Sequence, residues 1–141
     1  MRSTSVDDEL VTRLRLALAR SARRLRQESG TGLSPSLTAA LATIERQGPL
    51  TPSELAARER VQRPTVTRIV DRLEELGLVT RAADPGDRRS SLITVTRAGR
   101  ELLASARTRK DAFLSERLEA LGPEDRATLE RAASLLEDML E

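Results

Sequence analysis

Hydrophobic residues recur at intervals of three and four along most of the chain, and this spacing predicts helices that each bury one face. The first predicted helix covers residues 8–27 and is followed by a glycine-containing joint at 29–32. The clearest helix start is Thr51-Pro52-Ser53-Glu54, a capping box with proline in the first helical position. The further predicted helices cover 34–47, about nine residues from 51, then 62–76 and 96–121, with a break at 58–61, and a last helix follows Gly122-Pro123.

The pattern changes after Gly77, where two short segments rich in β-branched residues, 78–82 and 91–95, predict strands. Between them, Asp84, Gly86 and Asp87 predict a turn, because aspartate side chains bond to the backbone of turns and glycine adapts to it. A lone hairpin is only marginally stable in water, so it must pack on helices. The predicted fold class is therefore mainly α with one β-hairpin.

A short helix, a tight break, a second helix and then a hairpin are typical of a winged helix-turn-helix. The second helix of such a pair lies in the major groove of DNA, with its N-terminal side chains at the base edges. Gln62 can be bidentate to adenine, and Arg63 or Arg68 to guanine. The methyl groups of Thr65 and Thr67 can touch thymine. The alternative is a surface helix whose polar side chains face only solvent, and the basic hairpin that follows favours DNA.

Arg88 and Arg89 follow the predicted turn and give the hairpin its positive charge. A guanidinium at this place can enter a narrow minor groove, where the potential is most negative. The alternative is that an aspartate and Arg89 pair across the turn and hold its shape. We therefore predict a minor-groove or phosphate contact for Arg88 and a mixed structural and phosphate role for Arg89.

The first, fifth and sixth predicted helices carry apolar stripes that the small winged module cannot cover. About 26 residues of helix span roughly 39 Å, which is longer than a small domain is wide. Burial against a second copy predicts a two-fold dimer, and the alternative is a compact monomeric bundle. The expected organisation is an N-terminal dimerisation helix at 1–32, a winged lobe at 33–100 and C-terminal dimerisation helices at 101–141. The predicted interface residues are Leu10, Leu14, Leu18, Phe113, Leu118, Leu129, Leu136 and Met139.

Composition narrows the function further, because the 141 residues include no cysteine and no histidine. A disulfide framework, a zinc site of the usual kind and a histidine general base are therefore excluded, and we expect no catalytic residue, metal or cofactor. Phe113 is the one aromatic residue, which excludes base stacking on aromatic side chains. No apolar run approaches the roughly 20 residues that cross a bilayer, so we expect no membrane partner and a cytoplasmic location.

The net charge of +2 makes no case for nucleic acid by itself, but the charge is unevenly distributed. Residues 51–100 hold ten arginines against seven acids, whereas residues 111–141 hold nine acids against three arginines. This distribution leaves room for a basic face on the middle of the chain. It is also consistent with helix faces that merely face solvent.

Four segments, in this order and spacing, resemble the MarR family of bacterial winged-helix regulators, and the likeness covers nearly the whole chain. They are 50–56 (LTPSELA), 61–79 (VQRPTVTRIVDRLEELGLV), 84–89 (DPGDRR) and 95–99 (VTRAG). The resemblance implies an obligate dimer that binds an inverted-repeat operator, usually as a repressor. It also implies a small anionic, often aromatic, ligand that binds between the dimerisation helices and the DNA lobe and releases DNA. By position it adds Pro64 to the major-groove contacts, Ser53 as a phosphate contact and Arg88 as the wing contact.

We therefore predict a dimeric, sequence-specific regulator of transcription that binds double-stranded DNA and is released by a small-molecule effector. The predicted DNA-binding residues are Ser53, Gln62, Arg63, Pro64, Thr65, Thr67, Arg68, Arg72, Arg88 and Arg89. Arg13, Arg15, Arg20 or Arg24 could pair with an anionic effector, and they fit equally well as solvated helix charges. The alternative function is a winged-helix protein-interaction module without specific DNA binding.

Overall fold

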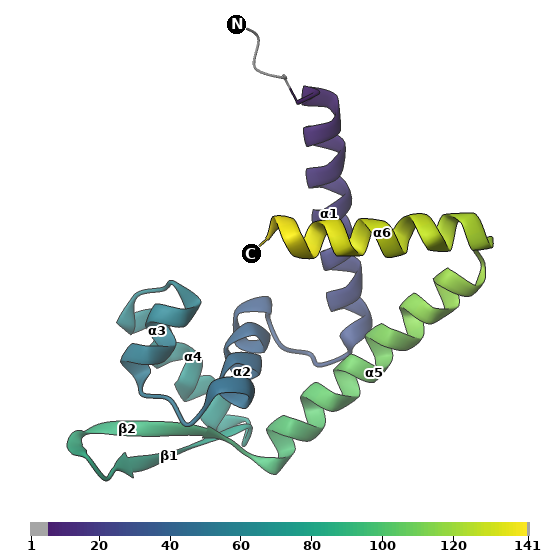
Figure 1. Ribbon diagram of the computed structural model, residues 1–141. Coiled ribbons are helices and arrows are strands. Elements are labelled where there is room, and N and C mark those ends of the chain that lie inside the picture. The colour runs from purple at the N-terminus through teal and green to yellow at the C-terminus, as the bar shows by residue number, and fades with distance from the viewer. Residues whose placement is uncertain (1–5, 141) are drawn as a thin grey trace, which may run out of the picture. The chain divides into compact units, whose positions relative to one another are not determined.

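The computed structural model describes residues 6–140 and all of their side chains except that of Arg88. Within this range the chain forms six helices and one two-stranded antiparallel sheet (Figure 1). The elements are α1 (Asp8–Ser29), α2 (Pro35–Gln47), α3 (Pro52–Glu59), α4 (Arg63–Glu75), β1 (Val79–Asp84), β2 (Asp87–Val95), α5 (Arg97–Glu119) and α6 (Pro123–Met139). The chain divides into a central unit, Ser29–Arg107, and a terminal unit made of Met1–Glu28 and Thr108–Glu141.

Local side-chain bonds fix the helix starts at the predicted places. At α3, the N–H of Glu54 donates to Thr51 Oγ1 at 3.1 Å and the N–H of Thr51 donates to Glu54 Oε1 at 3.2 Å, so the capping box is complete. At α5, the N–H of Gly99 donates to Thr96 Oγ1 at 3.1 Å. These bonds satisfy backbone donors that a helix start leaves without a partner.

The break between α3 and α4 is shorter than predicted. We expected this break at 58–61, but α3 continues through Glu59. Arg60 ends the helix in a left-handed conformation with φ 54°. The N–H of Val61 donates to Ala56 O at 3.1 Å and that of Arg60 to Ala57 O at 3.3 Å. This pair of bonds is the Schellman ending, which glycine usually provides.

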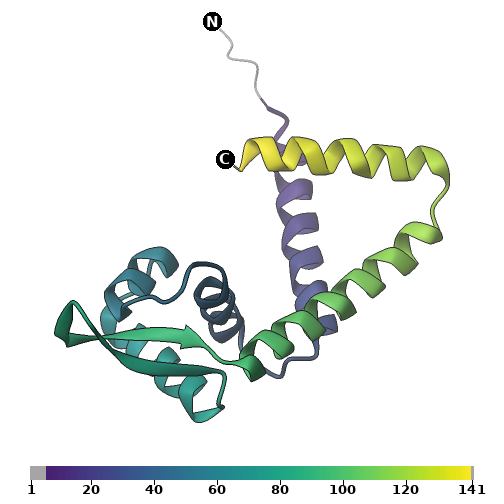
Figure 2. The ribbon, with the colours of Figure 1, turned by 60° about the horizontal axis from the view of Figure 1, so that its bottom comes forward.

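The hydrophobic core lies in the central unit, where α2, α3, α4, the hairpin and the first part of α5 meet. The side chains of Leu41, Leu55, Leu73 and Ile93 are completely buried. Every buried hydrophobic residue of the described chain belongs to this unit. The hairpin lies along α2, α3 and α4, and its turn projects beyond these helices (Figure 2).

The hairpin is longer and its turn tighter than predicted. The strands pair from Val79 opposite Val95 to Asp84 opposite Asp87, so only Pro85 and Gly86 connect them. Asp84 Oδ1 accepts the N–H of Gly86 and Asp87 Oδ1 accepts that of Arg89, both at 2.9 Å. Arg88 and Arg89 consequently lie in β2, whereas we had expected them in the loop between the strands.

Residue Leu50 adds a short third connection to the sheet. Its N–H donates to Ile93 O at 3.1 Å, and the N–H of Ile93 donates to Leu50 O at 2.7 Å. Leu50 immediately precedes the N-cap of α3, so these two bonds hold the start of α3 against β2.

The terminal unit has no buried hydrophobic residue among its described positions. Except for Leu76, the exposed large hydrophobic residues of the described chain all belong to the terminal unit. They are Val6, Leu10, Val11, Leu16, Leu18, Leu114, Leu118, Leu129, Leu135, Met139 and Leu140. None of the described helices is long and apolar enough to cross a membrane.

Candidate nucleic-acid interface

The start of α4 presents polar side chains to solvent while its other face enters the core. Val66, Val70 and Leu73 are buried, because they recur at helical spacing on one side of α4. Gln62 is the N-cap residue, but its side chain makes no capping bond. The predicted DNA-binding residues of α4 that are exposed are Gln62, Arg63, Pro64, Thr67, Arg68 and Arg72.

Thr65 is the exception among the predicted residues of this helix. It is half-buried and lines a groove of about 280 Å³ between α2 and α4, beside Ser36 and Glu59. The structure therefore does not bring Thr65 together with the other predicted contacts.

Ser53 and Arg63 are joined by a direct bond between the starts of α3 and α4. Arg63 Nη1 donates to Ser53 Oγ at 2.6 Å. Both residues line a polar cleft of about 260 Å³ that the start of β2, next to the turn, completes with Asp87 and Arg89. The lining of this cleft is Pro52, Ser53, Arg63, Asp87, Arg89, Ser90 and Ser91. The bonds between Leu50 and Ile93 explain why residues of α3 and β2 line the same cleft, because these bonds hold the start of α3 beside β2.

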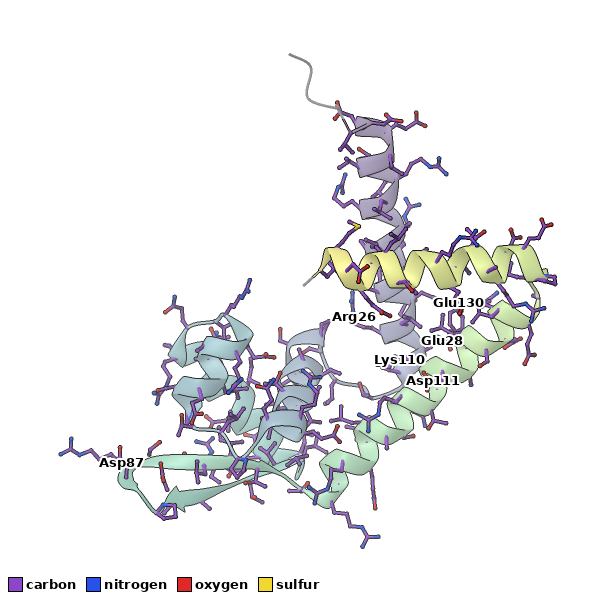
Figure 3. All side chains as sticks on the ribbon, in the orientation of Figure 1. Arg26, Glu28, Asp87, Lys110, Asp111 and Glu130 are labelled. Atoms are coloured by element: carbon purple, nitrogen blue, oxygen red, sulfur yellow. The ribbon has the colours of Figure 1, made fainter. Side chains whose placement is uncertain are left out.

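The wing turn consists of the predicted residues, and it lies at the outer end of the hairpin, where Figure 3 labels Asp87. Asp87 is bonded to the backbone N–H of Arg89 and not to its guanidinium. Among the described residues the Arg89 side chain has no ion pair, and it is exposed. The side chain of Arg88 lies outside the described residues.

Arg81, which lies in a predicted strand and had no predicted role, contacts α4. Its Nη2 donates to Asp71 Oδ1, and its Nε lies 3.6 Å from Glu74 Oε1. Strand alternation is the signal that could have found it, because Arg81 lies on the same face of β1 as the buried Val79. Arg72, a predicted DNA contact, pairs with Glu75 at 3.2 Å and is still half exposed.

Five of the eight predicted interface residues of the terminal unit line two apolar grooves. Leu10, Leu14, Leu18 and Met139 line the first, of about 570 Å³. Phe113 lines the second, of about 320 Å³, with its ring 5.1 Å from the Arg24 guanidinium and 4.7 Å from that of Arg117. The other predicted residues line neither groove: Leu118 and Leu129 are exposed, and Leu136 is half-buried.

The chemistry of the central unit suits the binding of a polyanion. Arginine and serine side chains converge in the cleft between α3, α4 and β2, and arginine is a strong bidentate partner for phosphate. Among the described residues, no group of three or more acidic side chains is placed to hold a metal ion.

Comparison with known proteins decides the family. The model of the MarR family matches residues 33–91, and a helix-turn-helix transcriptional regulator of Mycobacterium bovis is 39% identical over 131 residues, 92% of each chain. The chain belongs to the MarR family. This MarR-family protein is therefore a DNA-binding transcriptional regulator and not an enzyme, and the predicted family and fold are confirmed.

Two solved structures share the fold over nearly the whole length of this MarR-family chain. A putative transcriptional regulator of Pseudomonas aeruginosa is 32% identical with a TM-score of 0.87, over 99% of both chains. An S. aureus MepR mutant bound to an oligodeoxyribonucleotide is 18% identical with a TM-score of 0.73, over 94% of this chain and 98% of the other.

Proposed function

We propose that this MarR-family regulator binds an inverted-repeat operator as a homodimer and represses transcription there. The observation that carries the proposal is the contrast between the two surfaces. The start of α4 and the neighbouring cleft are polar and basic, whereas the terminal helices expose nearly all of the large apolar side chains that the described chain leaves in solvent.

The proposed reading surface is the exposed start of α4. The side chains of Gln62 and Arg68 are exposed, that of Gln62 makes no capping bond, and that of Arg68 is in no ion pair of the described residues, so both are available to a base edge. Arg63 is already bonded to Ser53, so we assign it to a backbone phosphate that enters the cleft with Arg89. The MepR mutant, which has the same fold and is bound to an oligodeoxyribonucleotide, supports DNA as the partner.

The dimer is supported by the apolar surface of the terminal unit. Monomeric proteins rarely expose many large apolar side chains close together, and burial against a second copy removes them from water. Such a dimer places two α4 helices about 34 Å apart, on successive major grooves. DNA covered in this way is closed to RNA polymerase, which is why we propose repression, in the cytoplasm beside the chromosome.

We also propose a small anionic aromatic effector. The second groove of the terminal unit offers an aromatic ring, Phe113, and the guanidinium groups of Arg20, Arg24 and Arg117. Benzoate is the simplest probe of this chemistry. We expect it to weaken operator binding by the wild type more than by Arg117→Gln, and equal weakening of both would refute this site.

The experiment that tests the function is selection of duplexes by the purified protein from a library with a random central segment. We expect an enriched inverted repeat with half-site centres about 10 base pairs apart, bound by two chains. Affinity should fall steeply with salt, with a slope of about −0.9 for each phosphate neutralised. Enrichment of no sequence over the starting library would overturn the proposal and favour the protein-interaction module. A selected site without repeat, bound by one chain, would overturn the dimer.

A further inference from the structure

The side chain of one arginine, Arg81, joins the second half of α4 to the hairpin. Asp71 and Glu74 lie one turn apart on α4, and their side chains are 54% and 47% exposed. Arg81 of β1 contacts both of them, and its own side chain is 30% exposed. Among the described side chains, no other ion pair joins α4 to the hairpin.

The position of Arg81 in β1 explains why its side chain lies over α4. Successive side chains of a strand point to opposite faces, so Arg81 shares a face with Val79, which is buried in the core. Its cross-strand partner is Ile93, which is also completely buried. The aliphatic stem of Arg81 therefore follows the edge of the core, and the guanidinium reaches beyond that edge to α4.

Arg81 provides a second attachment between α4 and the hairpin, which are also joined by a backbone hydrogen bond nearby. The N–H of Leu78 donates to Leu73 O at 2.9 Å and ties the start of the hairpin to α4. Leu50 already holds β2 at Ile93, which is opposite Arg81 in the sheet, so the Arg81 contacts anchor the β1 side of the hairpin at the same level. The wing arginines lie beyond this level on the same hairpin, so the contacts of both strands set their distance from the start of α4.

The same contact also controls the charge of α4. Asp71 follows Thr67 by four residues and therefore lies on the same face of the helix, one turn away. A carboxylate at this place repels the phosphates of a bound duplex. The guanidinium of Arg81 neutralises it without occupying the reading surface itself.

We propose that Arg81 is a positioning residue for DNA recognition, which holds the wing at a fixed angle to α4 and masks Asp71 and Glu74. The inference rests on the proposed function, in which α4 enters the major groove and the wing engages the same duplex. It assigns Arg81 no contact with DNA. Its removal therefore affects the selected operator more than random duplex, because only specific binding needs the wing and α4 in exact register.

The test compares Arg81→Gln in two backgrounds, the wild type and Asp71→Asn/Glu74→Gln, on the duplex obtained by selection. In the wild type, we expect operator affinity to fall on the order of tenfold, with an unchanged salt slope. In the acid-free background, Arg81→Gln should change affinity by less than about twofold, since its partners are already neutral. Arg81→Lys should recover part of the loss. Arg97→Gln is the matched control, because Arg97 forms an exposed pair with Glu101 at 2.9 Å on α5 and should leave affinity unchanged.

Three results would overturn the inference. A salt slope that is smaller by about 0.9, with the same loss in both backgrounds, would show that Arg81 contacts a phosphate itself. Unchanged operator affinity of Arg81→Gln would show that it has no part in recognition. A lower unfolding midpoint, with unchanged affinity well below that midpoint, would reduce Arg81 to a stabilising contact. If the wild type itself selects no duplex, the proposed function fails instead.

Discussion

Replacing two leucines of the first terminal groove should separate the proposed dimer into monomers. The substitutions are Leu10→Gln and Leu18→Gln, made together, because glutamine forms helices almost as well as leucine and removes the apolar surface. The two residues are 55% and 41% exposed in the single chain, so about half of each is left for a partner to cover. The central unit holds the whole described core and should fold unchanged.

The size of the effect follows from these exposures. Burying a complete leucine side chain contributes about 2 kcal/mol, so the exposed parts of the two contribute about 2 kcal/mol together. A two-fold interface contains each residue twice, which gives about 4 kcal/mol for the dimer. A tenfold change in Kd corresponds to about 1.4 kcal/mol, so the dissociation constant of the dimer should rise roughly 500-fold to 1,000-fold.

Sedimentation equilibrium over a wide range of protein concentration measures this change directly, and circular dichroism checks that the helices persist. Leu76→Gln is the matched control, because Leu76 is 40% exposed but lies in the central unit. The control should leave the dimer intact. A double variant that stays as dimeric as the wild type would refute the assignment of this groove to the interface.

The remaining predictions concern the reading surface and the stability of the central unit. Arg68→Ala should lose about 1–3 kcal/mol of operator affinity and relax specificity at one position. Arg88→Ala should weaken binding to all duplexes alike and lower the salt slope by about 1. Binding isotherms at several salt concentrations measure both effects, and an equal loss on all sequences for Arg68→Ala would contradict base reading. Gly99→Ala should destabilise the fold by about 1–3 kcal/mol, since its new Cβ would lie 2.4 Å from Leu78 O, and urea unfolding that shows no change would contradict this close approach. Thr51→Ala should lose about 1 kcal/mol by the same assay because it removes the capping bond to Glu54, and an unchanged midpoint would mean that the cap contributes nothing.

The sequence predicted those features that depend on nearby residues. The starts of α3 and α5 follow from Thr51 and Thr96, whose side chains bond to the backbone three residues later. The exposed start of α4 follows from the spacing of Val66, Val70 and Leu73, because helical periodicity fixes the opposite face.

The features that the sequence missed depend on contacts between distant segments or on an unusual conformation. Arg60 ends α3 in a left-handed conformation that glycine usually adopts, so no local signal marked the place. Thr65 faces α2, and helical spacing alone does not say where α2 lies. The bonds between Leu50 and Ile93, and those of Arg81 with α4, join positions whose proximity only the tertiary fold creates.

The two-stranded sheet has a consequence for how copies of the protein meet. Leu50 flanks β2, so the outer side of β1 is the open margin of the sheet, and an open margin can recruit a strand from another molecule. β1 is only six residues long, carries the charged Arg81 and is followed directly by Pro85, which has no N–H to donate. These properties discourage neighbouring hairpins from merging into a ribbon, even at the high protein concentrations of a cell. Self-association is thereby left to the terminal helices, which is consistent with the proposed dimer.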